Sequence, residues 1–372
     1  MKVFRDPIHN VINLDTGDKI VNKLIIDIID SKEFQRLRFI RQLGFSYLSY
    51  PSANNTRFEH SLGTAFLAIR FLDKILSIED DKFANFIGQV KKDKPLTVVA
   101  ALLHDIGHGA LSHVSEELIT HRNHEQWGKA ILLGDTQINK LLRAYDNKAP
   151  QIICDLLDVK TPASKILSGQ LDVDRIDYLL RDSHMTGSGY GKFDVEWLIN
   201  VLTIGDIGNG QIEIGVDYSK GASVAEDFLM ARSYMFKNVY LHKTTLIAQE
   251  MVKLLFKRVK EIGVTDMPKN IKNIYFDDST SLDDYLSITD IDFYYFLKQL
   301  RNSSDEITKS LADKILNRDL TEKSFGYYVT KIAVPSKQKD DIYLFDKKGS
   351  CYKLSDFFAV PNWTTELKEM EL

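Results

Sequence analysis

The chain has 372 residues, of which 44% are hydrophobic and 27% charged, and its formal net charge is −4 at pH 7. This length allows one large domain with an appendage, or two domains. The balance of charge excludes a disordered acidic tail and a strongly basic nucleic-acid coat. Cys154 and Cys351 form no CxxC pair, so neither a disulfide framework nor a zinc knuckle is indicated. We expect a cytoplasmic protein without membrane contact, because no apolar signal segment opens the chain.

The N-terminal half is predicted to be mainly helical after a short β segment. Residues 3–14, "VFRDPIHNVINL", are typical of a strand or hairpin. Ser31 is a suitable N-cap for a helix through "EFQRLRFIRQLG", which we expect to end at Gly44. A helix over residues 57–76 comes next, and Pro95 is placed to open the helix "PLTVVAALLHDIGHG".

Further helices are expected near residues 122–133, 148–158 and 171–182. The stretch "IGDIGNGQIEIGV" places Gly-Asn-Gly between β-favouring residues and predicts a hairpin. One long helix is expected to follow, from about Ala222 to Ile262. These elements indicate a mainly α fold with short β-hairpins.

The composition changes after about residue 265. Polar linkers, two helices near residues 281–317 and the β-favouring stretches "YYVTKIAV" and "DIYLFDKKGSCYKL" predict a C-terminal α+β lobe. We therefore divide the chain into a catalytic domain, residues 1–265, and a lobe, residues 266–372, which we expect to help subunits assemble.

The stretch "LLHDIGHGALSH" sets imidazoles and a carboxylate among apolar residues. Adjacent His104 and Asp105 follow the apolar run Val98 to Leu103. A lone His-Asp pair is more often a satisfied core polar pair or a helix cap than a metal site. Here the run must be buried, and burying an ionised aspartate beside an imidazole is costly unless a cation compensates. We therefore favour a pair of metal ligands.

Other ligands can come from the neighbouring helices. His60 lies in "TRFEHSLG", and "GQLDVDRIDYLLRD" repeats aspartates along an apolar helix, with Asp174, Tyr178 and Asp182 on one face. A zincin site is the rival interpretation, because "HDIGH" also spaces two imidazoles four residues apart. It is disfavoured, since aspartate replaces the general-base glutamate and glycine interrupts the helix.

The order of these residues resembles the H…HD…D pattern of the HD-domain metal-dependent phosphohydrolases. Six blocks of the sequence, in the family's order, resemble the dNTP triphosphohydrolase branch, which includes bacterial dNTPases and the SAM-and-HD-domain dNTPase of vertebrates. The resemblance covers most of residues 1–265. The blocks are "DPIHNVINL", "FQRLRFIRQLG", "TRFEHSLG", "LLHDIGHGALSH", "NHEQW" and "LDVDRIDYLLRDSHMTG".

The resemblance implies an HD-domain helical core and a divalent metal held by His60, His104, Asp105 and Asp174. The ion would be Fe, Mn, Zn or Mg, because imidazole and carboxylate ligands suit these to different degrees. His124 matches the catalytic histidine, and Glu116 stands where vertebrate relatives carry aspartate, which leaves its role open. Matches to phosphate contacts around this centre are Arg57, His108, His113, Arg175 and Arg232. Matches around the sugar and base are Gln42, Leu43, Tyr178, Asp182 and Tyr240.

The resemblance also implies a regulatory nucleotide site at a subunit interface. The residues that match its guanine-binding positions are Lys2, Val3, Asp30, Gln35 and Arg38. The alternative is an amphipathic helix whose arginines simply face solvent or pair with acids. If the site exists, a guanine nucleotide would activate the enzyme and promote a homo-oligomer, a dimer or tetramer.

The activity implied is hydrolysis of dNTPs to deoxynucleoside and tripolyphosphate. No Walker loop, GxxxxGK[ST], occurs in the chain, so arginines and histidines must supply the positive charge for a triphosphate. One alternative is an HD phosphohydrolase that acts on other nucleotides or on single-stranded nucleic acid. Another is a nucleotide-sensing binding protein, which would have no need of a proton-transferring histidine such as His124.

Overall fold

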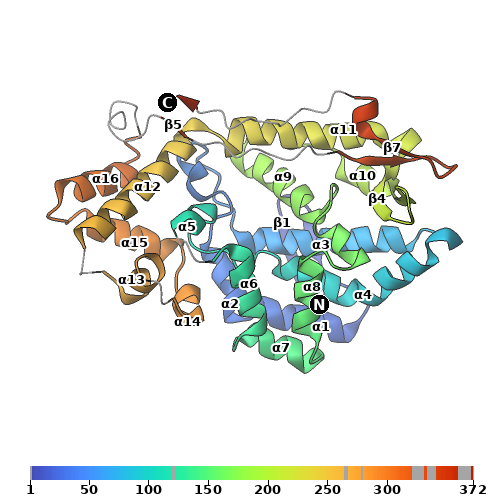
Figure 1. Cartoon of the computed structure of the whole chain (residues 1–372), viewed down its shortest axis with the longest axis horizontal. Coiled ribbons are helices and arrows are strands. Elements are labelled where there is room, and N and C mark those ends of the chain that lie inside the picture. Colours follow the sequence, from blue (N-terminus) through green and yellow to red (C-terminus); the bar gives the residue numbers. More distant parts are fainter. Residues whose placement is uncertain are drawn as a thin grey trace.

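The computed structural model describes residues 2–118, 122–263, 267–277, 280–320, 331–332, 341–358 and 370–371. The fold is mainly α, as predicted, and Figure 1 shows α12 to α16 at one end of the molecule and the strands β4 and β7 at the other. The α-helices are α1 (Lys19–Ile29), α2 (Lys32–Gln35), α3 (Arg57–Leu76), α4 (Ala84–Leu103), α5 (His113–Leu118), α6 (His124–Leu133), α7 (Gln137–Tyr145), α8 (Ala149–Leu157), α9 (Val173–Thr186), α10 (Val195–Val201), α11 (Tyr218–Met235), α12 (Lys243–Ile262), α13 (Lys269–Tyr275), α14 (Leu282–Leu286), α15 (Asp290–Leu300) and α16 (Glu306–Leu316). The strands are β1 (Val3–Asp6), β2 (Asn10–Asn13), β3 (Leu202–Asp206), β4 (Ile212–Asp217), β5 (Lys331–Ile332), β6 (Tyr343–Phe345), β7 (Cys351–Lys353) and β8 (Met370–Glu371).

Helix α3 is the centre of the larger hydrophobic core and packs against both α4 and α9. It spans the predicted residues and begins with a capping box, in which Glu59 accepts the backbone N–H of Thr56 at 2.9 Å. Apolar side chains on nearly every turn are buried, so α3 is held on several sides. α3 and α9 each carry one predicted metal ligand, and the other two directly follow the end of α4.

The predicted N-terminal hairpin is confirmed as the antiparallel pair β1–β2. The helix predicted to run from Ser31 to Gly44 is wrong beyond its first turns. Ser31 does cap α2, but a short 3-10 helix follows at Arg36–Phe39 and the backbone is extended at Ile40. The reason is tertiary pairing, because the Ile40 carbonyl accepts the N–H of Arg57 at 3.0 Å.

Two further helix boundaries differ from prediction. Pro95 lies inside α4 and does not open it, because the helix already begins at Ala84. Pro95 lacks an N–H and so removes one backbone hydrogen bond, a loss that the buried second half of α4 outweighs. The single helix expected from Ala222 to Ile262 is two helices, α11 and α12, separated by a π-helical turn at Phe236–Tyr240. His242 then caps α12 with its side chain.

The C-terminal segment contributes to two different parts of the fold. The hairpin β3–β4 is confirmed, and β6–β7 join it in one four-stranded sheet through a parallel β4–β6 pair. Three helices, α14 to α16, stand where two were expected, and they pack with α12 and α13 in a second hydrophobic core. Most of "YYVTKIAV" lies outside the described residues. The division at residue 265 stays a prediction.

No helix in the described part of the chain has both the length and the apolar composition that a bilayer crossing requires.

Candidate active site

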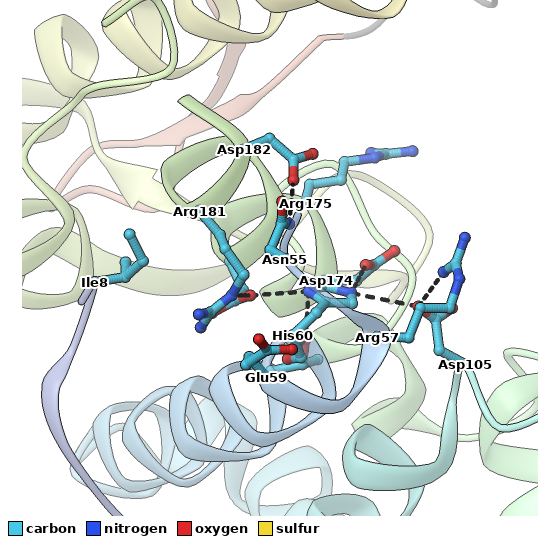
Figure 2. Close-up of polar contacts among 12 residues, drawn as sticks. Ile8, Asn55, Arg57, Glu59, His60, Asp105, Asp174, Arg175, Arg181 and Asp182 are labelled. Atoms are coloured by element: carbon cyan, nitrogen blue, oxygen red, sulfur yellow. Dashed lines mark hydrogen bonds and ion pairs between the residues drawn. The ribbon is translucent and has the colours of Figure 1, made fainter. Parts of the chain in front are cut away.

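Four predicted metal ligands, carried on or next to three helices, lie close together, and Figure 2 shows three of them, His60, Asp105 and Asp174. His60 lies on α3, His104 ends α4 with Asp105 next to it, and Asp174 lies in the first turn of α9. The Nε2 atoms of His60 and His104 are 3.1 Å apart, and Asp174 Oδ1 is 3.0 Å from the first and 3.4 Å from the second. Asp105 Oδ2 is 3.6 Å from His60 Nε2, and its Oδ1 is 3.5 Å from His104 Nε2.

The hydrogen bonds behind the two imidazoles favour a cation between them. His60 Nδ1 donates to Asp177 Oδ2 at 2.8 Å, and His104 Nδ1 donates to the carbonyl of Ala101 at 2.8 Å. When each imidazole is neutral with its proton on Nδ1, both Nε2 atoms present lone pairs to the space between them. Two facing lone pairs with two carboxylates beside them are the donor set of an Fe, Mn or Zn site. The residues present therefore fit a divalent metal.

The electrostatics of the site agree with this reading. Burial lowers the pKa of His60, but hydrogen bonds to Asp174 and Asp177 oppose it and bring that pKa to about 10. Burial raises the pKa of Asp105, yet Arg57 and His104 outweigh burial and hold it well below its usual range. The carboxylates are therefore ionised, and their field favours a positive charge at the Nε2 atoms, which a proton or a divalent ion can supply.

A buried carboxylate behind His60 was not assigned from the sequence. Asp177 is fully buried and accepts from His60, from His9 Nε2 at 2.7 Å and from Arg181 through two nitrogens. Arg181 in turn donates to Asp6 at 2.7 Å. A carboxylate behind a ligating histidine fixes its ring orientation and tautomer. His9 therefore supports the site from the N-terminal hairpin.

A second cluster lies beside the first and contains the predicted catalytic pair. His124 Nδ1 is 2.9 Å from Glu116 Oε1, and the His108 and His124 rings stack with centroids 4.0 Å apart. His108 Nε2 also lies 3.2 Å from Asp105 Oδ1, which joins the two clusters. Burial and Arg57 lower the pKa of His108 well below its usual value, so its ring is neutral. The side chain of His113 is outside the described part of the structure.

Gly107 explains how the two clusters come so close. A Cβ built on Gly107 would lie 2.1 Å from the His124 carbonyl oxygen and 2.3 Å from the Gly128 nitrogen. Only glycine lets the turn after Asp105 pack directly against the start of α6. The "HDIGHG" pattern therefore has a steric cause as well as a chemical one.

Both clusters open into one cavity of about 590 Å³. Tyr178, Asp182 and Tyr240 line it together, and Tyr240 donates to Asp182 Oδ2 at 3.0 Å. The sequence missed the wall that α12 contributes. The lining residues are Gln42, Leu43, Gly44, Ser46, Arg57, Asp105, His108, Leu111, Ser112, Val114, His124, Asp174, Tyr178, Asp182, Phe236, Tyr240, Leu241, Thr245, Leu246, Gln249, Glu250 and Lys253.

Three predicted phosphate contacts occupy different places. Arg57 is buried in the cavity wall, where it pairs with Asp105 and donates from Nε to Ser112 Oγ at 2.9 Å. Arg175 donates to the carbonyl of Gly169 at 2.6 Å and is not among the lining residues. Arg232 is buried and is also not among the lining residues, and burial and the charge of Arg175 lower its pKa.

The five residues matched to a regulatory site include one pair, Lys2 and Asp30, that is distant in sequence and close in space. Lys2 Nζ lies 2.6 Å from Asp30 Oδ1 on the surface, and Val3 beside it is exposed. Arg38 donates to Gln35 Oε1 at 2.8 Å. The N-terminal hairpin and the α1–α2 region therefore form one surface here.

Replacing Asp182 with asparagine is expected to stabilise the fold in a pH-dependent way. Burial raises the pKa of Asp182 to about 6, above the value of an unfolded aspartate. The folded state therefore favours the protonated form, and the stability this gives is lost as pH rises through about 6. Asparagine stays neutral, so the gain in unfolding free energy should be about 1 kcal/mol larger at pH 8 than at pH 5. Thermal unfolding at both pH values measures this, and equal gains would contradict it.

Comparison with known proteins agrees with the geometry. Residues 57–182 match the HD domain, and residues 193–342 match the HD associated region. The chain belongs to the HD-domain family of metal-dependent phosphohydrolases.

The chain is similar in sequence to several known proteins and in structure to a solved phosphohydrolase. The chain is 40% identical over 367 residues to an uncharacterized protein of Methanocaldococcus jannaschii. The aligned region covers 94% of this chain and 73% of that protein. It is 34% identical to the uncharacterized protein YwfO of Bacillus subtilis, over 86% of this chain and 71% of that one. Human deoxynucleoside triphosphate triphosphohydrolase SAMHD1 is 26% identical, over 82% of this chain and 52% of its own length. The crystal structure of a phosphohydrolase from Bacteroides thetaiotaomicron superposes with a TM-score of 0.80 at 25% identity, over 100% of this chain and 98% of that one.

Proposed function

We propose that the protein hydrolyses deoxynucleoside triphosphates to the deoxynucleoside and tripolyphosphate. We call His60, His104, Asp105 and Asp174 the four-donor centre. The observation that carries the proposal is a single cavity, lined by Asp105 and Asp174 of this centre and also by Tyr178, Asp182 and Tyr240. The donor centre and Arg57 suit a polyphosphate, while an aromatic face beside a carboxylate suits a deoxyribose. The similarity to SAMHD1 supports the same substrate class.

In this proposal, His60, His104, Asp105 and Asp174 hold the divalent ion. When bound, the ion supplies Lewis-acid polarisation of a phosphoryl oxygen. Arg57 lies close enough to neutralise charge that accumulates on phosphate oxygens during cleavage. The reaction adds water at the α-phosphorus and breaks its bond to the 5′ oxygen, which leaves as the nucleoside hydroxyl.

His124 is the proposed proton-transfer group. Its Nδ1 pairs with Glu116, which fixes the ring and leaves Nε2 for the substrate. The longer glutamate side chain reaches His124 at hydrogen-bond distance, so the aspartate-to-glutamate difference from vertebrate relatives is compatible with an orienting role.

The deoxyribose preference is proposed to come from Tyr178 and Asp182. Asp182 is held by Asn55 Nδ2 at 2.9 Å as well as by Tyr240, so its oxygens are fixed in the wall. A fixed carboxylate can accept the 3′-hydroxyl, and the Tyr178 ring leaves little room for a 2′-hydroxyl. The strength of such discrimination depends on how rigid the wall is.

An anion-exchange assay tests the proposal. The purified protein is incubated with each of the four dNTPs, with NTPs and with single-stranded oligonucleotides, with and without Mn²⁺. Tripolyphosphate and deoxynucleoside as products support the proposal. Orthophosphate, or cleaved oligonucleotide, would indicate an HD phosphohydrolase of different substrate class. Binding of a nucleotide without turnover would indicate a sensor.

We also propose that a guanine nucleotide binds at Lys2, Val3, Asp30, Gln35 and Arg38 and activates a homo-oligomer. GTP or dGTP is expected to shift the protein to a larger species in gel filtration and to raise turnover, because the site would join two subunits. Asp30→Ala should lose both responses while keeping its metal content. An elution profile and a turnover rate that GTP leaves unchanged would contradict the regulatory proposal.

A further inference from the structure

The loop between His108 and α5, within the second cluster, has an unusual backbone. Leu111 and Ser112 are consecutive, both are buried, and both have positive φ, +58° and +51°. Residues other than glycine seldom adopt this left-handed region, and they persist there only where the surroundings hold them. The loop borders His108 at one end and α5, with Glu116, at the other. Something outside the loop must fix it.

Asp290, at the start of α15, contacts this loop directly. Its carboxylate is buried, and Oδ1 accepts the N–H of Leu111 at 2.8 Å. Oδ2 accepts the N–H of Arg41 at 3.0 Å. The carbonyl of Arg41 accepts the Ser112 hydroxyl at 2.8 Å, and that hydroxyl oxygen also accepts from Arg57 Nε. One carboxylate therefore ties the left-handed loop to the arginine that lies against Asp105.

Tyr285, on α14, holds the other end of the loop. Its hydroxyl donates to the Gly107 carbonyl at 2.6 Å. Its ring stacks on Trp127, with centroids 4.0 Å apart and planes within 6°. Trp127 lies one turn after His124 on α6, so Tyr285 contacts both the turn after Asp105 and the helix that carries the proton-transfer histidine.

The segment that carries both residues is itself anchored. Arg36 Nε donates to the carbonyl of Ile288, between Tyr285 and Asp290, at 3.2 Å. Arg36 is buried and lies over the Tyr285 ring at 5.3 Å. The α14–α15 connection is therefore fixed against the N-terminal part of the chain and can act as a rigid support.

We propose that Asp290 and Tyr285 are positioning residues for the reaction, through which the segment after residue 265 sets the geometry of the loop between His108 and Glu116. They act through Leu111, Ser112 and Gly107 and do not touch the substrate. This inference rests on the proposed function, because the loop is important only if Arg57, His108 and His124 act on a phosphorylated substrate. It gives the C-terminal segment a role within each subunit, apart from any role in assembly.

The variants Asp290→Ala, Asp290→Asn and Tyr285→Phe test it, with two control variants on α15. Asp292→Ala removes another aspartate of α15, one that caps the helix by accepting the N–H of Thr289 at 2.8 Å. Tyr295→Phe changes an exposed tyrosine of α15. For each protein we would measure kcat, KM, metal content by mass spectrometry, the melting temperature, and hydrogen–deuterium exchange of the peptide that contains residues 107–112.

Asp290→Ala is expected to lower kcat on the order of 10²-fold with a small change in KM, because misplaced catalytic groups affect the reaction more than binding. Asp290→Asn keeps one acceptor oxygen and should recover part of the rate. Tyr285→Phe keeps the stack on Trp127 and should lose about 10-fold. Hydrogen–deuterium exchange at residues 107–112 should be faster in all three variants, and their metal content should be unchanged. The two controls should have the kcat and the exchange rate of the wild type.

Two results would overturn the inference. One is a folded Asp290→Ala protein with wild-type kcat and wild-type exchange at residues 107–112. The other is an equal loss in Asp292→Ala, which would mean that helix stability alone is responsible. If the wild type hydrolyses no dNTP, the proposed function fails, but the exchange comparison still decides whether Asp290 and Tyr285 hold the loop.

Discussion

Replacing Asp105 with alanine is expected to remove both the bound metal and all measurable turnover. Asp105 is the carboxylate that lies within 3.6 Å of both ligand imidazoles while it pairs with Arg57 and His108. Its loss removes a ligand and leaves the buried Arg57 guanidinium without its carboxylate, so a positive charge then opposes a cation at the same place. Metal analysis and the anion-exchange assay on the same preparation measure both effects.

The control for this variant is Asp73→Ala. Asp73 lies on α3, as His60 does, but its side chain is exposed. Its salt bridge with Lys94 is on the surface, so it contributes little to the stability of the fold. It should keep metal and activity. Because Asp105→Ala also leaves a buried charge, Asp105→Asn is measured beside it to separate loss of the ligand from loss of the fold. A folded Asp105→Asn protein with full metal content and full rate would contradict the assignment.

Replacing His124 with alanine is expected to separate metal binding from chemistry. His124 lies outside the four-donor centre and pairs with Glu116, so the metal content should be unchanged. The rate should fall by about 10²–10⁴-fold, the usual effect of losing an acid–base group. Rates over a range of pH, with metal content measured in parallel, test this.

Glu116→Gln is the informative partner of that variant. The amide has the same size but no charge, so it weakens the orientation of His124 without removing the imidazole, and we expect a smaller loss than in His124→Ala. His184→Ala changes an exposed histidine of α9 and should behave as the wild type. A fully active His124→Ala enzyme would contradict the proton-transfer role.

The parts of the site that sequence predicted best are those encoded by local patterns. His60 lies near the start of α3, and α3 has the predicted bounds. Asp174, Tyr178 and Asp182 recur at helical spacing, and all three do line one cavity. The prediction that residues of three helical segments meet at one metal, by contrast, depended on the family resemblance. Periodicity alone does not show which helices pack together.

What the sequence did not predict depends on contacts between distant segments. The helix expected up to Gly44 ends early because Ile40 pairs with Arg57, a tertiary hydrogen bond that overrides local helical preference. The π-helical turn between α11 and α12 contains no proline or glycine, so the sequence gives no sign of a break there. This turn nevertheless brings the Tyr240 hydroxyl within hydrogen-bond distance of Asp182. Asp177 and Asp290 look like ordinary helix aspartates until their partners, His60 and Leu111, are seen beside them.

The metal site is tested most directly by a crystal of the protein grown with Mn²⁺ and measured at the manganese absorption edge. We expect an anomalous peak within coordinating distance of His60, His104, Asp105 and Asp174 together. A peak elsewhere, or a well-ordered site at these four side chains that binds no ion at saturating Mn²⁺, would contradict it.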